Sequence, residues 1–348
     1  MTKRRILIVL PVIMVCLLFM EGLLRLTGSR PFPYMNVEEK VEPSDYAGYH
    51  TVYGYCLIPG SYDITVGNKL KFHVTHDADS FRITRLQKDS ANYTGKPGVH
   101  IYGCSFTWGE GINDSSTFPF LVQTAMPQYN VRNRGLSAAG EIQAYLQLKE
   151  EIRKGQQPKI AILSYASFHN ERNTFNRAWA TQIKQFLINK SKTEFRGAEL
   201  KSKLDYLDSI RFPQARSMND SLQVLYKPMN GDLFPFSRYS ALCNAVNNVL
   251  IRLDEKKINS NDVTRKIFYE LNVMCKKNGI RLIIACLDDD DLTKNMQQYF
   301  KEHGIEWFGY GVNYQDNNYN LYPYDLHPNE KANAIYAKKI LDYLAMHP

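Results

Sequence analysis

Residues 99–111, with the sequence VHIYGCSFTWGEG, decide the fold class of this chain. Val99 to Tyr102 form a short apolar run that predicts a strand ending at Gly103. A small residue before a serine lets the chain turn sharply, so Ser105 would present its hydroxyl with backbone N–H groups beyond it facing a developing oxyanion. Taken alone, the stretch is more typical of a structural serine in a glycine-rich loop. A catalytic role for Ser105 therefore depends on complementary residues elsewhere in the sequence.

Strands and helices alternate along most of the chain. The run from Lys159 to Tyr165 is almost wholly apolar, as expected of a strand in a parallel sheet that is covered on both faces. The predicted strands are 99–102, 129–132, 159–165, 281–287 and 306–312, and the predicted helices are 118–126, 140–154, two within 238–278, and 328–346. This order predicts an α/β fold, a three-layer α/β/α sandwich with a mostly parallel sheet.

The composition excludes several classes of protein. Of the 348 residues, 44% are apolar and 22% are charged, which suits a large core and not a disordered or collagen-like chain. The net charge is +8, but no basic run is interleaved with aromatic residues, so we expect no nucleic-acid partner. The six cysteines have no regular spacing, which argues against a disulfide scaffold and a zinc site, and we expect neither a metal nor another cofactor.

The N-terminus combines a basic flank at residues 3–5 with an uninterrupted apolar run at 6–20, and a span counted to residue 26 includes Glu21 and Arg25. A cleaved signal peptide, an uncleaved membrane anchor and a buried helix of a soluble protein are the three interpretations. We favour the anchor, because no A-x-A cleavage site follows and about 20 apolar residues suffice to cross a bilayer. The basic flank would stay in the cytoplasm, which predicts a single-pass protein of a bacterial-type cell membrane with its main domain on the exported (periplasmic or extracellular) side.

The domain organisation follows from these patterns. We expect a signal anchor at 1–27, a linker at 28–45, a β-rich leader with a short hairpin at 46–97, and the main domain at 98–348. Within that domain, residues 171–235 show helical pieces and loops, and we interpret them as an insertion.

The last loop, Tyr324-Asp-Leu-His-Pro-Asn329, carries a histidine and a carboxylate two residues apart. A serine nucleophile needs an adjacent base, and a carboxylate can fix the tautomer of a histidine base. Pro328 suits the first position of the closing helix, which would hold His327 at the helix start. The alternative is that Asp325 or His327 only caps that helix. Because Ser105 lies at another strand end, the complementary parts favour a catalytic site.

Four blocks of the sequence resemble those of the SGNH (GDSL-type) hydrolases. They are GCSFTWGEGINDSSTFP at 103–119, NRGLSAAG at 133–140, HNERN at 169–173 and DLHPN at 325–329. Upstream, GYCLIP at 54–59 and SFR at 80–82 resemble the leader of the exported cell-envelope branch. The resemblance spans about residues 46–346 and implies the flavodoxin-like SGNH-hydrolase fold.

The resemblance also implies site residues. Ser105 would be the nucleophile, His327 the base and Asp325 the acid that orients it. The oxyanion would be held by the N–H groups of Ser105 and Ala138 and by the side-chain amide of Asn170.

This chain departs from the family pattern in several places. Cys104 stands where many members have aspartate, and we expect it to pack, while Ala138 stands where a glycine is expected. Spacing alone leaves His169 and Asn173 open as the third-block donor, and both are pocket candidates. Trp108 and Tyr324 are further candidates for the pocket wall, although Trp108 could equally pack under the turn.

Three functions compete at this point. The favoured one is a membrane-anchored serine esterase that hydrolyses acyl esters, O-acetyl groups above all, on a cell-envelope glycan or lipid. The Asp-x-His form of the last block resembles branches that act on cell-envelope polysaccharides, including O-acetyltransferases, so an acyltransferase with the same triad is the alternative. A catalytically silent glycan-binding or assembly module is the third, since fold does not imply function. The acylated glycan or lipid and the membrane are the expected partners, and the oligomeric state stays open.

Overall fold

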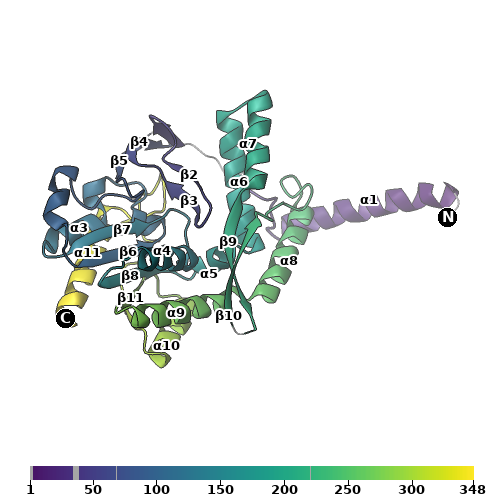
Figure 1. Cartoon of the computed structure of the whole chain (residues 1–348). Coiled ribbons are helices and arrows are strands. Elements are labelled where there is room, and N and C mark those ends of the chain that lie inside the picture. The colour runs from purple at the N-terminus through teal and green to yellow at the C-terminus, as the bar shows by residue number, and fades with distance from the viewer. Residues whose placement is uncertain (1–2, 34–38, 68, 220) are drawn as a thin grey trace. The chain divides into compact units, whose positions relative to one another are not determined.

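A parallel five-stranded sheet organises the larger of two compact units in the computed structural model of this chain (Figure 1). The structure describes residues 3–33, 39–67, 69–219 and 221–348, so the predicted linker at 28–45 lies partly outside the described residues. The larger unit comprises residues 38–175, 210–228 and 260–348, and the smaller unit comprises 1–37, 176–209 and 229–259.

The central sheet confirms the predicted parallel arrangement. Its strands, in spatial order, are β7 (Asn130–Gly135), β6 (Gly98–Gly103), β8 (Ile160–Tyr165), β11 (Arg281–Cys286) and β12 (Glu306–Gly309). Every neighbouring pair is parallel. Counted along the chain, this is the order 2-1-3-4-5 of flavodoxin-like sheets, in which ligands bind where the strand order reverses, beside the first strand. Here that first strand is β6, which leads into Ser105.

Helices cover both faces of the sheet, as a three-layer fold requires. In the larger unit they are α2 (Ser105–Trp108), α3 (Phe118–Ala125), α4 (Glu141–Arg153), α5 (His169–Thr174), α9 (Ser260–Lys277), α10 (Asp291–Glu302) and α11 (Glu330–Met346), with 3-10 turns η1 (Gln87–Tyr93) and η2 (Asp114–Ser116). One apolar core joins α4, α9 and α10 to the sheet. A second core joins α3 and α11 to the opposite side of the same strands.

A β-rich leader precedes the sheet, as predicted. It contains β1 (Glu39–Glu42), β2 (Ala47–His50), β3 (Gly54–Leu57), β4 (Gly60–Val66) and β5 (Leu70–His76). The antiparallel hairpin of β4 and β5 pairs with β1, and β2 pairs with β3. A third apolar core carries leader residues such as Ile64 and Val74 together with Trp108 from α2. The leader therefore packs against the segment that carries Ser105.

The range predicted as an insertion of helices and loops also holds a β-hairpin, which that prediction missed. The hairpin consists of β9 (Arg211–Met218) and β10 (Ser221–Pro228), paired along their whole length. Pro213 lies inside β9, and proline cannot donate to a strand ladder, so it disfavours a strand in sequence-based reasoning. Pairing with β10 overrides that local signal.

The smaller unit is helical. Its helices are α1 (Lys3–Leu26), α6 (Arg177–Glu194), α7 (Gly197–Ser209) and α8 (Ala241–Ile258). Within the described part of the chain, no helix has both the length and the apolar character needed to cross a membrane.

The closing helix starts two residues later than predicted. Asn329, not Pro328, precedes its first turn, and the Asn329 side chain accepts a hydrogen bond from the Ala332 N–H at 3.2 Å. An asparagine at this position satisfies one of the free amides of a helix start. Neither Asp325 nor His327 therefore caps α11, and both side chains remain available to the site.

A glycine at the end of β7 permits the close packing beneath Ser105. A Cβ atom built at Gly135 would lie 2.3 Å from the Trp108 backbone nitrogen, on the helix that carries Ser105. We predict that Gly135→Ala destabilises the protein by about 1–3 kcal/mol or more, because backbone atoms cannot move aside as a flexible side chain can. Urea unfolding would measure this cost. Gly309→Ala is the matched control, since a Cβ there meets no atom within 4 Å; equal stability losses in the two variants would contradict the prediction.

Candidate active site

The turn after β6 presents Ser105 at the carboxyl edge of the sheet. Gly103 ends the strand with a φ of 157°, and Ser105 is the first residue of the short helix α2. A Cβ at Gly103 would lie 2.2 Å from the Thr107 hydroxyl and 3.0 Å from the Ser164 Cβ, so only glycine fits this close approach. The predicted sharp turn is therefore present, and it fixes the nucleophile candidate between β6 and β8.

The loop before α11 brings His327 to the same edge. Hydrogen bonds across the loop hold it closed: the Leu321 N–H donates to the His327 carbonyl at 3.0 Å, and the Asn329 N–H donates to the Tyr319 carbonyl at 3.0 Å. The Phe106 ring packs edge-on against the His327 ring, with centroids 5.6 Å apart.

Ser105, His327 and Asp325 form one hydrogen-bonded chain. The distance from His327 Nε2 to Ser105 Oγ is 2.8 Å, and that from His327 Nδ1 to Asp325 Oδ1 is 2.5 Å. The same carboxylate oxygen also accepts from the His327 backbone N–H at 2.8 Å. A carboxylate on Nδ1 leaves Nε2 free to accept the serine proton, which is the geometry of a nucleophile, a base and an orienting acid.

The charges around the imidazole favour its protonated form. Although burial opposes it, the hydrogen bond to Asp325 and the negative charges of Glu110, Asp325 and Cys104 raise the pKa of His327. Burial also opposes ionisation of Asp325, but the hydrogen bond and charge of His327 lower the pKa of that carboxyl. An imidazolium formed during proton transfer is thus stabilised in place.

Glu110 is a functional candidate to which the sequence analysis gave no role. It is 9% exposed, and it accepts a hydrogen bond from the Ser137 hydroxyl at 3.1 Å. Burial, reinforced by the charges of Glu39 and Asp325, raises the pKa of Glu110 to about 7, against the opposing effects of His327 and Ser137. The only sequence signal was its place in the first block, at the strand-end loop that carries Ser105.

The second block lies beside this carboxyl. Ala138 has a φ of 63°, a left-handed conformation that glycine adopts without strain and alanine rarely adopts. This explains why a glycine is expected at the position. Ala138 therefore keeps the left-handed backbone conformation that would favour a glycine at this position.

The three third-block candidates differ in what their side chains contact. The Asn170 amide accepts from the Tyr165 hydroxyl at 3.2 Å and donates to Asn261 at 3.5 Å. The Asn173 amide donates to Glu141 at 2.7 Å and to the Thr264 hydroxyl at 2.9 Å. These contacts distinguish the two amides, and the role of Asn170 as an oxyanion donor stays a prediction.

His169 joins a second buried cluster below the nucleophile turn. Its Nδ1 lies 2.6 Å from Glu141 Oε1, and both side chains are only 1% exposed. Although burial opposes it, the charges of Glu141 and Cys104 raise the pKa of His169. Burial likewise opposes ionisation of Cys104, yet the charge of His169 lowers the pKa of the thiol. The cluster thus couples Cys104, the residue before Ser105, to a buried histidine and glutamate, which the expectation of an inert packed Cys104 did not include.

Trp108 does not line a pocket, in contrast to one of the two sequence-based interpretations. It is fully buried, its indole N–H donates to His76 Nε2 at 3.2 Å, and its ring stacks on Tyr46 at 5.2 Å. Tyr324 is 43% exposed and lies three residues before His327, and its place in a pocket wall stays a prediction. Tyr322 (61% exposed) and Leu326 (64% exposed) extend this surface beside the base.

A second serine, histidine and aspartate also line up, on the exposed face of the β4–β5 hairpin. His73 Nε2 lies 2.8 Å from Ser61 Oγ, and His73 Nδ1 lies 2.8 Å from Asp63 Oδ1. The Asp63 side chain is 75% exposed and that of His73 is 46% exposed. Water screens such surface contacts, and no strand-end turn supports Ser61. The set is a polar contact across two strands, and it provides a matched control for the Ser105 site.

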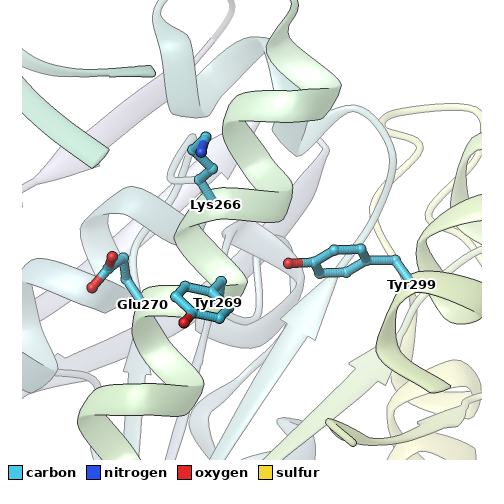
Figure 2. Close-up of a pocket in the computed structure, with 4 residues that line it drawn as sticks. All are labelled: Lys266, Tyr269, Glu270 and Tyr299. Atoms are coloured by element: carbon cyan, nitrogen blue, oxygen red, sulfur yellow. The ribbon is translucent and has the colours of Figure 1, made fainter. Parts of the chain in front are cut away.

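A hollow of about 330 Å³ lies elsewhere on the larger unit, lined by Lys266, Tyr269 and Glu270 of α9 and Tyr299 of α10 (Figure 2). It contains none of the site residues. Its side chains pair no nucleophile with a base, so we assign it no chemistry.

The fold and the site together define a class: a flavodoxin-like α/β protein with a serine hydrogen-bonded to a histidine at the switch point of its sheet. No protein-family model matches the sequence, and no curated protein matches it either.

Solved structures similar to this chain are G-D-S-L family proteins and carbohydrate esterases. A member of the lipolytic protein G-D-S-L family from Veillonella parvula is 10% identical over 71% of this chain and 98% of its own, with a TM-score of 0.37. An acetyl xylan esterase from Butyrivibrio proteoclasticus is 14% identical over 72% of this chain and 63% of its own, with a TM-score of 0.35. A family two carbohydrate esterase from Clostridium thermocellum, in complex with cellohexaose, is 8% identical over 71% and 63%, with a TM-score of 0.36. The V. parvula protein carries the family name that the sequence blocks resemble. The assignment of the site rests on its own geometry.

Glu110 should set the pH at which Ser105 becomes reactive. A charged Glu110 stabilises the His327 imidazolium, and only neutral imidazole accepts the serine proton. Replacing Glu110 by glutamine removes that charge, lowers the pKa of His327 and should shift the rising limb of Ser105 reactivity to lower pH. The rate of labelling by a fluorophosphonate between pH 5 and 9 measures the limb. Asp63→Asn, on the exposed hairpin, is the control; an unshifted limb in Glu110→Gln would contradict the coupling.

Proposed function

We propose that this protein is a serine esterase that removes acyl groups, O-acetyl groups above all, from a glycan or lipid of the cell envelope. The observation that carries the proposal is the hydrogen-bonded chain from Ser105 through His327 to Asp325. A serine so paired is an activated nucleophile. Esters are its natural substrates, since the attack needs only a carbonyl carbon and a leaving alcohol.

The reaction follows from the geometry. Ser105 Oγ attacks the ester carbonyl while its proton passes to His327 Nε2, and Asp325 stabilises the imidazolium. The tetrahedral oxyanion would meet the N–H groups at Ser105 and Ala138, at the start of α2 and in the second block. Collapse expels the alcohol, which takes the proton from His327 and leaves an acyl-serine. Water, deprotonated by His327, then attacks the acyl carbon, and the proton returns to Ser105 as the acid leaves.

The surface beside the base supports a glycan as the group that carries the ester. Tyr322, Tyr324 and Leu326 are all exposed and lie within five residues of His327. Aromatic rings offer flat apolar faces with polar edges, which suits sugar rings. The Asn170 side-chain amide remains the candidate for a third oxyanion contact.

Replacing the nucleophile should abolish turnover without unfolding the protein. We expect Ser105→Ala, as the full chain in detergent, to lose turnover of p-nitrophenyl acetate on the order of 10³-fold or more. A fluorophosphonate adduct should map to Ser105 by mass spectrometry. The matched control is Ser61→Ala, which removes the exposed serine of the same geometry and should leave the rate unchanged. Unchanged turnover in Ser105→Ala, or an adduct on Cys104, would exclude the proposed nucleophile. Faster release of p-nitrophenol in the presence of an acceptor oligosaccharide would indicate acyl transfer in place of hydrolysis.

We further propose that the N-terminal segment anchors the protein with its main domain on the exported side. The proposal is supported by the basic flank at residues 3–5 and by the large apolar side chains of α1 that are exposed, among them Val15, Leu18 and Phe19 at 62%, 65% and 71%. An alkaline-phosphatase fusion to the C-terminus should therefore be active, and carbonate washing should leave the protein in the membrane pellet. A mature soluble form that starts near residue 30 would instead identify a cleaved signal.

A further inference from the structure

The one acidic residue of the apolar N-terminal segment serves as a cap for another helix. Glu21 accepts hydrogen bonds from the Ser240 hydroxyl at 2.7 Å, the Ala241 N–H at 2.9 Å and the Leu242 N–H at 2.8 Å. The two amides belong to the first turn of α8, which has no partners within its own helix for them. Arg25 adds an ion pair to the Glu21 carboxylate at 2.6 Å. The charge of Glu21 is thus compensated from within the smaller unit.

Three more hydrogen bonds extend this contact into a clamp, by which we mean the paired segments 21–32 and 234–244. Arg25 donates to the Tyr239 carbonyl at 2.9 Å. The Asn244 amide donates to the Arg30 carbonyl at 2.9 Å, and the Phe32 N–H donates to the Ser237 carbonyl at 2.8 Å. The C-terminal end of α1 is therefore fixed to the start of α8 and does not act as a free tether.

The clamp presents two aromatic side chains to the outside. Phe236 is 73% exposed and Tyr239 is 78% exposed, more than any other aromatic side chain in the described part of the chain. Phe236 has a φ of 61°, a left-handed conformation that is unfavourable for a bulky residue. Strain of this kind persists only where the surroundings impose it and is common at functional sites. The fold thus imposes an outward position on an apolar ring that could otherwise be buried.

The apolar side chains exposed on α1, the clamp and α8 are better suited to a lipid bilayer than to water. The exposed apolar residues of α1 continue up to Leu26, and the exposed face of α8 carries Val246, Val249 and Leu253 at helical spacing. Aromatic side chains concentrate at the interface between the apolar layer and the headgroups. Segments 21–32 and 234–244 contain three arginines and a single acid, Glu21, so their net positive charge suits anionic headgroups.

We propose that the clamp inserts Phe236 and Tyr239 into the interfacial layer of an anionic lipid bilayer, so that the end of α1 and the start of α8 enter the membrane surface as one rigid element. The inference rests on the membrane anchoring proposed above and extends it to a second contact. The smaller unit would then bind the membrane through this clamp as well as through α1.

Tryptophan scanning with brominated lipids tests the insertion. The full chain is reconstituted in vesicles of phosphatidylcholine and phosphatidylglycerol, with or without bromine on the acyl chains. Phe236→Trp and Tyr239→Trp are compared with Tyr206→Trp, a 47% exposed position on α7 of the same unit. Emission of the three native tryptophans is subtracted with the unmodified chain. We expect brominated lipid to quench the added emission at 236 and 239 and to leave that at 206 unchanged. Adding Glu21→Ala should reduce the quenching at 239, because it removes the cap that holds the clamp.

The outcomes separate this inference from the proposals on which it rests. Equal quenching at 206, 236 and 239 in protein that stays in the carbonate-washed pellet would overturn the insertion alone. Unquenched emission at 236 and 239 in protein that remains in the carbonate-washed pellet would also overturn it. Protein that fails to enter vesicles at all would instead refute the anchor, and the acylation of Ser105 is measured independently of both.

Discussion

The 2.8 Å contact between Ser105 Oγ and His327 Nε2 joins two residues 222 positions apart in the sequence, and the remaining features of the site depend on it. Such a contact is possible because parallel strands end at one edge of the sheet, so loops far apart in the chain meet there. Gly103 and Gly135 allow the turn under Ser105 to approach Ser164 and the neighbouring strand closely. On the other side, the loop that ends at Asn329 is closed by its own backbone hydrogen bonds. The turn after β6 and the loop before α11 therefore fix the distance between Ser105 Oγ and His327 Nε2.

Electrostatics then distinguishes this serine from the exposed one on the hairpin. Both Ser105 and Ser61 contact a histidine that in turn contacts an aspartate, at similar distances. Around Ser105 the charges of Asp325, Glu110 and Cys104 act on a half-buried ring, and each of them favours the imidazolium. Around Ser61 the carboxylate is largely in water, where charge interactions are weak. The same three residue types thus differ in chemistry because their surroundings differ.

The smaller unit shows the same dependence on context. An acid within an apolar helix is costly if it lacks partners. Glu21 avoids that cost by capping α8, whose first-turn amides need an acceptor. Glu21 lowers the hydropathy of the N-terminal segment, but in the structure it stabilises the contact between α1 and α8.

The sequence alone determined the parallel strands, the order of helices, the serine turn and the histidine loop, because each of these depends on local spacing. Apolar runs and periodicity predicted the strands that form the sheet, and two short motifs predicted Ser105, Asp325 and His327, which the structure brings together. Only the tertiary structure decided the partners of side chains. It set the hydrogen-bond partners of Asn170 and Asn173, buried Trp108, brought the charge of Glu110 to act on His327 and paired β9 with β10 despite Pro213. The physical reason is that the direction and charge of a side chain are set by residues distant in sequence, and local spacing carries no information about them.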